Sequence, residues 1–390
     1  MEWHLITSEY PPQIGGVSDY TFGVANGLAD CGDDVHVWCP TGPSMETKTR
    51  RVTVHRCLGS ISSSDLREFA RQLNAFTPPR RVLVQWVPHG YKYRSMNIGF
   101  CWWIWRRSVA RRDSVTLMVH EPYLPFSFKS LRQAGAAVVH RLMTILLLQA
   151  SKSVYVSIPE WEARWRPYTL GRKVQFEWLP IPSNVAVVGD AEAAQAIRRR
   201  YVSGNNILLG HFSTFGSPVC SVLEPILSRL LADGTGHGIL LIGKGSTEFR
   251  ERFVQREPIA ALRLHATGTL SLTEISAHLA ACDVLIQPYP DGVSTRRTSF
   301  MAGLSHGKPI VTTVGELTEP FWLKANCMGL VPAADLRSFV NLTQQICRAE
   351  AERIRMGRTA RVLYLERFDI SHTIARLRDM SAEEGRACAS

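Results

Sequence analysis

The sequence predicts an α/β protein made of two Rossmann-like domains, and three observations support this prediction. The chain has 390 residues, which is enough for two domains of ordinary size with a core each. Along most of its length, short apolar runs alternate with helical segments, an order typical of parallel sheets covered by helices. A proline-rich segment at 179–184 has the composition of a linker between the two halves.

The N-terminal half begins with a βαβ unit. We expect an apolar strand at 3–8, a loop carrying Gly15 and Gly16, a helix, and a second strand at 34–40. Two buried strands are expected next, at 81–87 and 114–119. A core helix at 134–150 and a further strand at 152–157 follow them.

The C-terminal half repeats this alternation. Helices are expected at 191–201 and 352–377, and strands at 207–212, 238–243 and 262–268. Its most informative stretch lies at 283–313. That stretch is expected to form a buried strand at 283–287 and a loop at 288–298. A helix at 299–305 and a second strand at 309–313 complete it.

The loop after the strand at 283–287 predicts an anion-binding site. In an open α/β sheet, ligands bind at the carboxyl ends of strands, where helix N-termini present free N–H groups. This loop is rich in Gly, Ser and Thr and carries Arg296 and Arg297 side by side. Small residues let the backbone approach a ligand, and guanidinium groups make paired bonds to phosphate oxygens, so we expect a diphosphate here. The alternative is a strand-turn-helix unit whose arginines lie in solvent.

The N-terminal half offers a second set of candidates. His120 and Glu121 directly follow the strand expected at 114–119, so they should lie at the carboxyl edge of its sheet. The alternative is a histidine that caps its own loop. Gly15 and Gly16 lie at a strand-to-helix turn, which itself can require glycine. Because they do not form a G-x-G-x-x-G fingerprint, a bound dinucleotide is not expected.

The sequence resembles GT-B glycosyltransferases, most closely the large retaining family 4. The resemblance covers most of the chain and is carried by Ile14-Gly15-Gly16, Gly268-Thr269-Leu270, Glu274, Ala281-Cys282-Asp283, Pro288 and Gly307-Lys308-Pro309. Two positions differ from the family pattern. The two glutamates of the family's Glu-seven residues-Glu motif correspond here to Ser294 and Ala302, so the family's donor carboxylates do not transfer to this chain.

The resemblance implies a fold and a reaction. The fold is two Rossmann-like domains facing a cleft, with a C-terminal helix that crosses back to the N-domain. The implied ranges are an acceptor-binding domain at 1–180, a nucleotide-sugar-binding domain at 181–370, and the returning helix and tail at 371–390. The implied reaction moves a sugar from a nucleotide-diphosphate sugar to an acceptor hydroxyl with retention at the anomeric carbon. Positioning and charge stabilisation would drive it, without a protein nucleophile.

The resemblance also implies roles for particular residues. His120 would contact the transferred sugar, with Glu121 beside it. The family's Arg and Lys-Gly pair after the first C-domain strand has no counterpart at 213–218, so we expect Arg296 and Arg297, with Lys244, to stabilise the leaving phosphate. The expected catalytic residues are therefore His120, Arg296, Arg297 and Glu121. The expected donor-binding residues are Gly15, Gly16, Gly216, Gly243, Lys244, Thr269, Leu270, Asp291, Gly292, Val293, Ser294, Thr295 and Ser299.

Cysteine usage and the N-terminus favour the cytoplasm. Nine cysteines occur without a C-x-x-C pair, which argues against a disulfide framework and a zinc site. The N-terminus has no signal pattern, and no uninterrupted apolar run supports a membrane span. Without an Asp-x-Asp motif in a suitable loop, we expect no essential metal and no cofactor beyond the donor itself. Asp33 and Asp34 are expected to be solvated turn residues.

Charge suggests where partners bind. The net charge is +11, with 22 Lys and Arg against 14 Asp and Glu in residues 1–180, and 23 against 20 in the remainder. A basic N-terminal half could meet an anionic membrane, a phosphorylated acceptor or nucleic acid. Residues 100–112 contain three tryptophans and four arginines. They would form either an interfacial helix at the inner face of the membrane or a crossover helix packed on the sheet.

The expected function is glycosyl transfer in polysaccharide or glycoconjugate biosynthesis. The expected partners are a nucleotide-sugar donor and a sugar, lipid-linked or small-molecule acceptor. One alternative is a GT-B protein that binds, hydrolyses or epimerises a nucleotide sugar without transferring it, which the missing second glutamate favours. The other is a basic nucleic-acid-binding protein. We expect no nucleic acid, because neither a known module nor a basic groove with stacking aromatics is evident.

Overall fold

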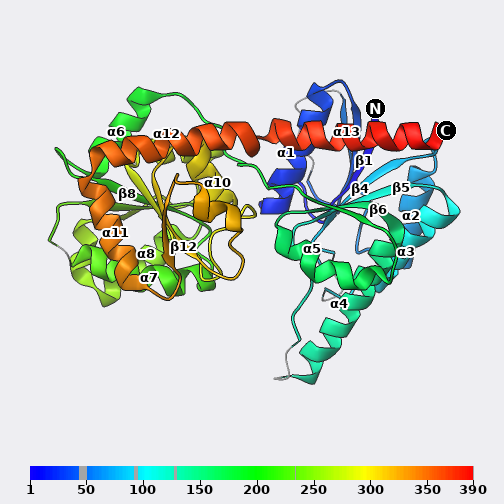
Figure 1. Cartoon of the computed structure of the whole chain (residues 1–390), viewed down its shortest axis with the longest axis horizontal. Coiled ribbons are helices and arrows are strands. Elements are labelled where there is room, and N and C mark those ends of the chain that lie inside the picture. Colours follow the sequence, from blue (N-terminus) through cyan, green and yellow to red (C-terminus); the bar gives the residue numbers. More distant parts are fainter. Residues whose placement is uncertain (44–50, 92–94, 127–129, 233, 390) are drawn as a thin grey trace. The chain divides into compact units, whose positions relative to one another are not determined.

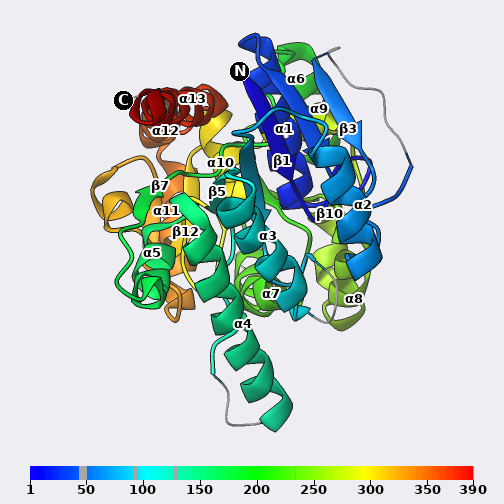
Figure 2. The ribbon, with the colours of Figure 1, turned by 90° about the vertical axis from the view of Figure 1, so that its right-hand side faces the viewer.

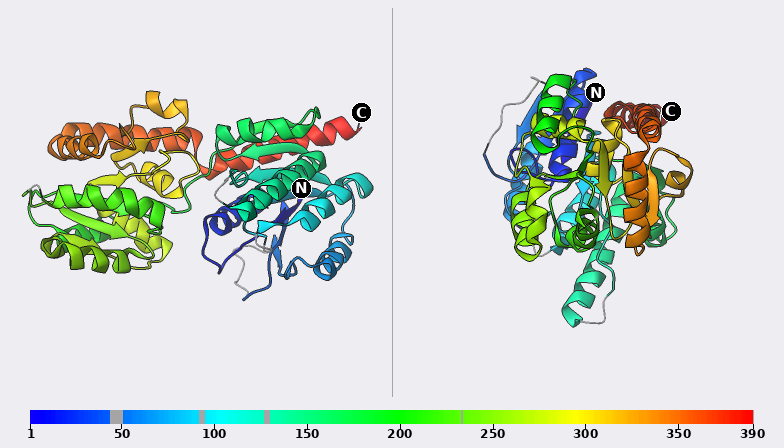
Figure 3. Two further views of the ribbon diagram at one scale, coloured as in Figure 1. Left: turned by 90° about the horizontal axis from the view of Figure 1, so that it is seen from below. Right: turned by 90° about the vertical axis from the view of Figure 1, so that its left-hand side faces the viewer.

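The protein divides into two compact units. The structure, a computed structural model, describes residues 1–43, 51–91, 95–126, 130–232 and 234–389, with side chains described as far as residue 379. Unit 1 comprises Met1–Pro180 together with Ile370–Ser390, and unit 2 comprises Ile181–Asp369 (Figure 1). Each unit has its own parallel sheet with helices on both faces (Figure 3). The prediction of two Rossmann-like domains is therefore confirmed.

Unit 1 is built on a sheet in which the described strands run parallel in the order β3-β2-β1-β4-β5-β6-β7. The strands are β1 (Glu2–Ile6), β2 (Asp34–Trp38), β3 (Val52–His55), β4 (Arg81–Trp86), β5 (Ser114–Val119), β6 (Ser151–Val156) and β7 (Gln175–Trp178). The helices are α1 (Gly16–Asp30), α2 (Ser63–Leu73), α3 (Ile98–Ala110), α4 (Leu131–Ala150), α5 (Pro159–Trp165) and α13 (Ile370–Ala389). The strand order reverses between β1 and β4, so the crevice for ligands is expected beyond the carboxyl ends of these two strands.

Unit 2 repeats the plan with the described strands in the parallel order β10-β9-β8-β11-β12-β13. The strands are β8 (Leu208–Phe212), β9 (Gly238–Ile242), β10 (Leu264–Ala266), β11 (Val284–Gln287), β12 (Ile310–Val314) and β13 (Gly329–Pro332). The helices are α6 (Ala191–Tyr201), α7 (Ser217–Leu231), α8 (Ser246–Arg256), α9 (Leu272–Ala281), α10 (Thr298–Ser305), α11 (Leu336–Arg348) and α12 (Glu350–Arg367). The order reverses between β8 and β11, which places the expected crevice beside the loop that follows β11.

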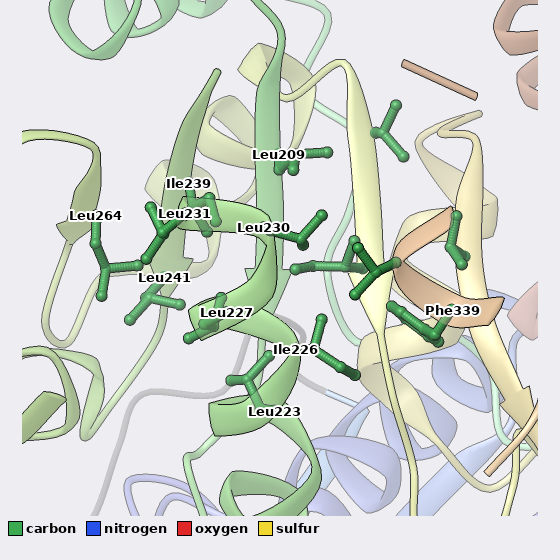
Figure 4. Packing of buried hydrophobic residues seen from close by; sticks show 14 of the residues in the cluster. Leu209, Leu223, Ile226, Leu227, Leu230, Leu231, Ile239, Leu241, Leu264 and Phe339 are labelled. Carbon is green, nitrogen blue, oxygen red and sulfur yellow. The ribbon is translucent and has the colours of Figure 1, made fainter. Parts of the chain in front are cut away.

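The core of unit 2 shows why its central strands read as continuous apolar runs. One face of α7 packs Leu223, Ile226, Leu227 and Leu230 against the sheet, and each of these side chains is buried (Figure 4). Strand β9 is buried along its whole length. A parallel sheet covered on both faces buries every residue of its inner strands, so the usual alternation of apolar and polar residues is lost.

The C-terminal helix packs on unit 1. Helix α13 lies beside α1 (Figure 1). Gly23 and Gly27 of α1 are the points of close approach. A Cβ atom added at Gly27 would lie 2.7 Å from Cγ1 of Ile374, and one at Gly23 would lie 3.0 Å from Cδ1 of Ile370. The two glycines therefore allow the close approach of α13. The expectation that the last helix belongs with the N-terminal domain is confirmed.

Three sequence-based expectations are wrong. Asp33 is not a solvated turn residue: it is buried, and its carboxylate accepts hydrogen bonds from the N-terminal ammonium of Met1 at 2.7 Å and from Nε1 of Trp3 at 3.3 Å. The expected helix at 352–377 is two helices, because Phe368 ends α12 before α13 begins.

The third wrong expectation concerns helix α4. It was expected as a core helix, but its N-terminal half extends away from the sheet (Figure 2). Leu131 is 95% exposed and Val138 is 49% exposed, whereas Leu147 and Leu148 near the other end are buried. Among the described helices, α4 is the one long and apolar enough to cross a membrane, and 33% of that span is buried in the protein.

Candidate functional site

The carboxyl edge of the unit 2 sheet brings most of the expected donor-binding residues together. Arg296 and Arg297 lie in the loop between β11 and α10, and Gly216 precedes α7 in the loop after β8. Because β8 and β11 are hydrogen-bonded neighbours on either side of the order reversal, these two loops lie where the crevice of such a sheet is expected. Gly243 and Lys244 follow β9, and Thr269 and Leu270 lie beyond β10, farther along the same edge.

The centre of this edge is an Asp-Arg-Arg cluster, which we define as Asp291, Arg296 and Arg297. One oxygen of the Asp291 carboxylate accepts a hydrogen bond from Nη2 of Arg296, and the other accepts one from Nη2 of Arg297. The three side chains are 19–22% exposed, so the cluster is partly buried but reaches solvent. One carboxylate thus orients two guanidinium groups and leaves the cluster with a formal charge of +1.

A tyrosine supports the second guanidinium. Cζ of Arg297 lies 4.8 Å from the ring centroid of Tyr289, a cation–π arrangement. The hydroxyl of Tyr289 lies 2.8 Å from Oγ of Ser299, in the first turn of α10. Burial raises the pKa of Tyr289 to about 12, so its hydroxyl stays protonated at neutral pH. Arg297 is therefore held from two sides, by Asp291 and by an uncharged ring.

The start of α10 adds a second source of positive potential. Arg297 is the residue before the first helical position, and no side chain caps the helix. The first N–H groups of any helix lack partners within the helix, and the helix dipole favours an anion at this end. Cluster and helix start together provide guanidinium and backbone donors in one place, the combination that binds phosphate groups.

The buried carboxylate of Glu319 fixes the loop between β11 and α10 through hydrogen bonds. Oε1 of Glu319 accepts hydrogen bonds from the backbone N–H of Thr295 at 2.8 Å and from its hydroxyl at 2.6 Å, while Oε2 accepts one from Nε1 of Trp322 at 2.8 Å. Burial raises the pKa of Glu319. Gly292 has φ of +85°, and a Cβ atom there would collide with the backbone of Gly315. The loop therefore has one defined course, and glycine is required in it.

The structure separates the expected loop residues into two groups. Gly292, Val293, Ser294 and Thr295 are buried, and Val293 donates its N–H to the carbonyl of Thr313 at 2.7 Å. Three of them are thus placed to support the loop. Ser294 differs, because its buried hydroxyl has no hydrogen-bond partner in the described structure. A buried hydroxyl without a partner is costly, so Ser294 is the member of this group that a ligand could satisfy.

The loops after β8 and β9 contribute mainly backbone. Nδ1 of buried His211 lies 2.8 Å from the carbonyl of Ile286, and its Nε2 lies 3.0 Å from Oγ of Ser213. Burial lowers the pKa of His211 to about 4, so the ring is neutral and ties β8 to β11. Gly243 has φ of +112°, where a Cβ would collide with the carbonyl of Ser213. Lys244 beside it is exposed.

Unit 1 holds the remaining candidates, centred on His120. The imidazole is 9% exposed, and burial lowers its pKa to about 3. Its Nε2 lies 2.8 Å from Oε1 of Gln85, an arrangement in which Nε2–H donates, and its ring meets that of Tyr20 edge-on with centroids 4.9 Å apart. The carbonyl of His120 accepts a hydrogen bond from Nε1 of Trp161 at 3.0 Å. His120 is therefore a neutral, firmly positioned group on the carboxyl edge.

Glu121 points elsewhere. Its side chain is 47% exposed, and its Oε2 lies 3.4 Å from Nδ1 of His89. The contact pairs Glu121 with a surface histidine, while His120 pairs with Gln85. The two adjacent residues thus do not form one acid–base pair.

The Gly15-Gly16 loop is occupied by the protein itself. Oε1 of Glu9 accepts hydrogen bonds from the N–H groups of Val17 and Ser18, both at 3.0 Å, in the first turn of α1. A Cβ atom at Gly15 would collide with this carboxylate, whereas one at Gly16 would meet nothing. The N–H groups beside the two expected donor-binding glycines therefore already bind a carboxylate, and Gly15 makes room for it.

Four residues of this description were not expected from the sequence: Glu9, Gln85, Tyr289 and Glu319. Each acts through a neighbour that is distant in the sequence or through a bend of the chain, which a linear pattern does not display. Gln85 alone carried a signal, because a polar residue within the apolar run at 81–87 calls for a buried partner. Among the described residues, no three His, Cys, Asp or Glu side chains gather into a possible metal site.

Solved structures share this fold over nearly their full length. Sucrose-phosphate synthase from Thermosynechococcus elongatus is 16% identical with a TM-score of 0.74, and the match covers 99% of each chain. HepE from Anabaena, solved with UDP and glucose, is 14% identical with a TM-score of 0.72, over 98% of this chain and 100% of that one. WaaG, a glycosyltransferase involved in lipopolysaccharide biosynthesis, is 12% identical with a TM-score of 0.68, over 97% and 99%.

The comparisons establish the fold. No protein-family model and no curated protein matches the sequence. At identities of 11–16%, similarity to the solved structures shows two Rossmann-like domains of the GT-B type. Similarity of fold at this level does not determine the activity.

Proposed function

We propose that the protein is a glycosyltransferase that moves a sugar from a nucleotide-diphosphate sugar to an acceptor hydroxyl. The observation that carries the proposal is the Asp-Arg-Arg cluster beside the uncapped start of α10, on the edge of the unit 2 sheet where its strand order reverses. Two further structures of HepE, which shares this fold, contain UDP or UDP-glucose. The basic nucleic-acid-binding alternative gains no support from this arrangement.

The proposed chemistry follows from charge. When the sugar leaves, its bond to the β-phosphate oxygen breaks and negative charge grows on the diphosphate. Guanidinium and helix N–H groups that are already oriented stabilise this charge without reorganising. The neutral imidazole of His120 would accept or donate a hydrogen bond to the sugar or the acceptor without adding charge. We also propose retention at the anomeric carbon, which depends on the resemblance to family 4; the anomeric configuration of an isolated product tests it.

Removing either guanidinium tests the donor role. Arg296→Ala and Arg297→Ala should each lower kcat/KM for transfer by about 10²-fold or more, the size seen when one preorganised charge-stabilising donor is lost. The matched control is Arg229→Ala, which removes an exposed arginine of α7 in the same unit. Wild-type turnover in both cluster variants, with the melting temperature unchanged, contradicts the proposal.

A non-transferring nucleotide-sugar enzyme is the second candidate, favoured by one observation. The positions of the family's two glutamates are held by Ser294 and Ala302, and both side chains are fully buried. A donor ribose that relied on a carboxylate at position 302 would find none. Release of nucleoside diphosphate that requires an acceptor supports transfer, whereas release into water at the same rate without any acceptor supports hydrolysis.

The proposed cellular location of the protein rests on its cysteines and on helix α3. We propose a cytoplasmic protein that contacts the inner face of the membrane through residues 100–112. The eight described cysteines are free thiols, as a reducing compartment favours. Phe100 and Ile104 of helix α3 are buried against the fold, as a crossover helix requires. The membrane proposal is supported by the other face, where Trp102 is 46% exposed and Val109 is 63% exposed. Sedimentation with anionic vesicles, lost in Trp102→Ala/Arg106→Ala, tests the contact; unchanged sedimentation of that variant contradicts it.

A further inference from the structure

A groove of about 740 Å³ runs between α2 and α3 of unit 1, which lie side by side (Figure 2). We name it the α2–α3 groove. It extends from residues near the starts of both helices, Ser63 and Gly99, to residues near their ends, Asn74 and Arg111. Since α3 has 13 residues, the groove is roughly 20 Å long at 1.5 Å per residue. None of the expected catalytic or donor-binding residues lines it.

Small and aromatic residues together create this groove. Ala70 on α2 and Gly99 and Ala110 on α3 leave space where longer side chains would close the gap, and a Cβ atom at Gly99 would meet nothing within 4 Å. Part of the wall is apolar, formed by Ile61, Leu66, Met96, Phe100, Trp102 and Trp103. The ring of Trp103 stacks on that of Phe69 behind it, with 4.8 Å between centroids. The apolar part of this elongated groove fits a flexible hydrocarbon chain.

The rim of the groove is cationic. Arg67, Arg106 and Arg111 line it and are exposed, and no carboxylate pairs with any of them in the described structure. Cζ of Arg106 lies 5.4 Å from the ring centroid of Trp102, so this guanidinium is held over the groove wall. None of the described residues that line the groove is acidic. An anionic headgroup would complement this rim.

A fourth arginine that lines the groove, Arg107, differs from the three rim arginines because it is buried and paired. Arg107 is 6% exposed, and its guanidinium donates to Oδ2 of Asp113 at 2.6 Å and to Oδ1 of Asn74 at 3.2 Å. Its guanidinium is thus paired inside the protein with a carboxylate that it shares with Arg80. The three rim arginines have no such use in the fold, which makes them available to a ligand.

The surrounding sequence is charged in the same sense. Residues 69–159, which contain α3 and α4, carry thirteen Lys and Arg and only two Asp and Glu, Asp113 and Glu121. Asp113 is buried and bound by Arg80 and Arg107. This segment therefore accounts for a formal charge equal to the whole chain's +11. Three of these basic residues, Arg106, Arg107 and Arg111, line the groove, and an excess of positive charge attracts anionic ligands.

We propose that the α2–α3 groove binds the hydrocarbon chain of one anionic phospholipid, with the lipid phosphate on the arginine rim. The groove takes the apolar chain, and the guanidinium groups of Arg67, Arg106 and Arg111 bind the phosphate. This site lies apart from the donor cluster in unit 2 and does not depend on glycosyl transfer. It also defines the membrane contact more narrowly, as capture of a lipid chain between two helices.

Calorimetric titration with three probes tests the site: decyl phosphate, decanol and inorganic phosphate, all below micelle-forming concentrations. Decyl phosphate should bind wild-type protein about tenfold or more tightly than decanol, because only it carries the charge that the rim recognises. Inorganic phosphate should bind more weakly still, because it lacks the chain. Equal affinity for decyl phosphate and inorganic phosphate, or no binding of decyl phosphate, overturns the proposal.

Variants separate the chain from the headgroup. Ala70→Trp and Gly99→Leu each fill the groove from one helix and should abolish binding of decyl phosphate; Gly99→Leu serves if Ala70→Trp does not fold. Arg67→Gln/Arg106→Gln/Arg111→Gln should reduce the affinity to that for decanol. Arg132→Gln, at an exposed arginine of α4 outside the groove, should change nothing. Undiminished binding in folded Gly99→Leu contradicts the assignment, and nucleotide-sugar binding in unit 2, measured in parallel, is expected to persist in every variant.

Discussion

Asp291 shows how one residue can prepare a site for a ligand of opposite charge. Its carboxylate takes one hydrogen bond from each of two adjacent guanidinium groups, each of which carries five N–H donors. The arginines are thus oriented before a ligand arrives, and the cluster remains cationic. Preorganisation of this kind reduces the entropy lost on binding, which matters for long side chains such as arginine.

Glu9 plays the same role for a helix. Gly15 has φ of −178°, an extended conformation open to any residue, so the backbone alone does not require glycine there. The requirement comes from the Glu9 carboxylate, which lies against Gly15 and caps the N–H groups of Val17 and Ser18. The stability of α1 and the identity of residue 15 are therefore coupled.

A double-mutant cycle tests this coupling. Glu9→Ala should lower the free energy of unfolding by about 1 kcal/mol, the usual cost of losing a helix cap. Gly15→Ala should cost a similar amount because the new methyl group displaces the carboxylate, and the double variant should cost little more than either single variant. Gly16→Ala is the control and should be neutral or slightly stabilising, since its Cβ meets nothing. Additive effects in urea denaturation contradict the coupling.

These residues show where sequence reasoning succeeds and where it stops. Arg296 and Arg297 were expected to act as a pair, because adjacent arginines in a small-residue loop after a buried strand form a local pattern. That Asp291 binds both, and that Glu319 holds Thr295 from 24 residues away, depends on tertiary folding. Asp33 was misjudged for the same reason, since its partners Met1 and Trp3 are about 30 residues distant.

At the scale of elements, β11 and α10 could be predicted because their ends are marked by local sequence patterns. Strand β11 is a short apolar run stopped by Pro288, and Gly307, with φ of +61°, follows the helix just before Pro309. Helix α4 was misjudged because an apolar helix reads the same whether protein or another partner covers it. The periodicity of its sequence therefore does not show that its N-terminal half is exposed.

The packing of α13 on α1 gives a prediction at this scale. Gly27→Ala should destabilise the protein by about 1–3 kcal/mol, because the added methyl group would lie 2.7 Å from Ile374, whose side chain is buried. Gly135→Ala is the matched control, since Gly135 is also helical but its Cβ would meet nothing. That variant should be neutral or stabilising by up to about 1 kcal/mol, from the better helix propensity of alanine. Equal effects of the two substitutions in thermal unfolding contradict the packing argument.

At the scale of the whole molecule, buried neutral histidines make stability depend on pH. Burial lowers the pKa of His4 and His120 to about 3 and that of His211 to about 4. In the unfolded chain histidine titrates near pH 6.5, so at lower pH the unfolded state binds more protons than the folded state. The stabilising contribution of these groups is therefore complete above about pH 6.5 and is lost as the pH falls toward the folded-state values.

Urea denaturation measures this dependence. Each such histidine should lower the free energy of unfolding by up to about 1.4 kcal/mol per pH unit between about pH 6 and 4. The urea midpoint should fall steadily from pH 7 to pH 5, and the fall should be shallower in His4→Gln, which removes one titrating group. A midpoint that stays constant from pH 7 to pH 5 contradicts the account.

The molecule as a whole joins two Rossmann-like units with different surface chemistry. Unit 2 carries the Asp-Arg-Arg cluster at its sheet edge, whereas the excess of basic residues lies in unit 1 around α3 and α4. On this account, diphosphate recognition belongs to unit 2, and contact with acceptors or lipids belongs to unit 1.

Thermal unfolding with UDP, GDP, ADP and TDP sugars tests the central claim most directly, because a ligand that binds only the folded state raises the melting temperature. We predict that at least one donor stabilises the wild-type protein, by about 2.7 kcal/mol at 100 times its Kd. The shift should disappear in Arg296→Ala/Arg297→Ala and persist in Arg229→Ala. A shift of wild-type size in the double cluster variant, or no shift with any of the four donor classes, would contradict the assignment of the cluster as the diphosphate site.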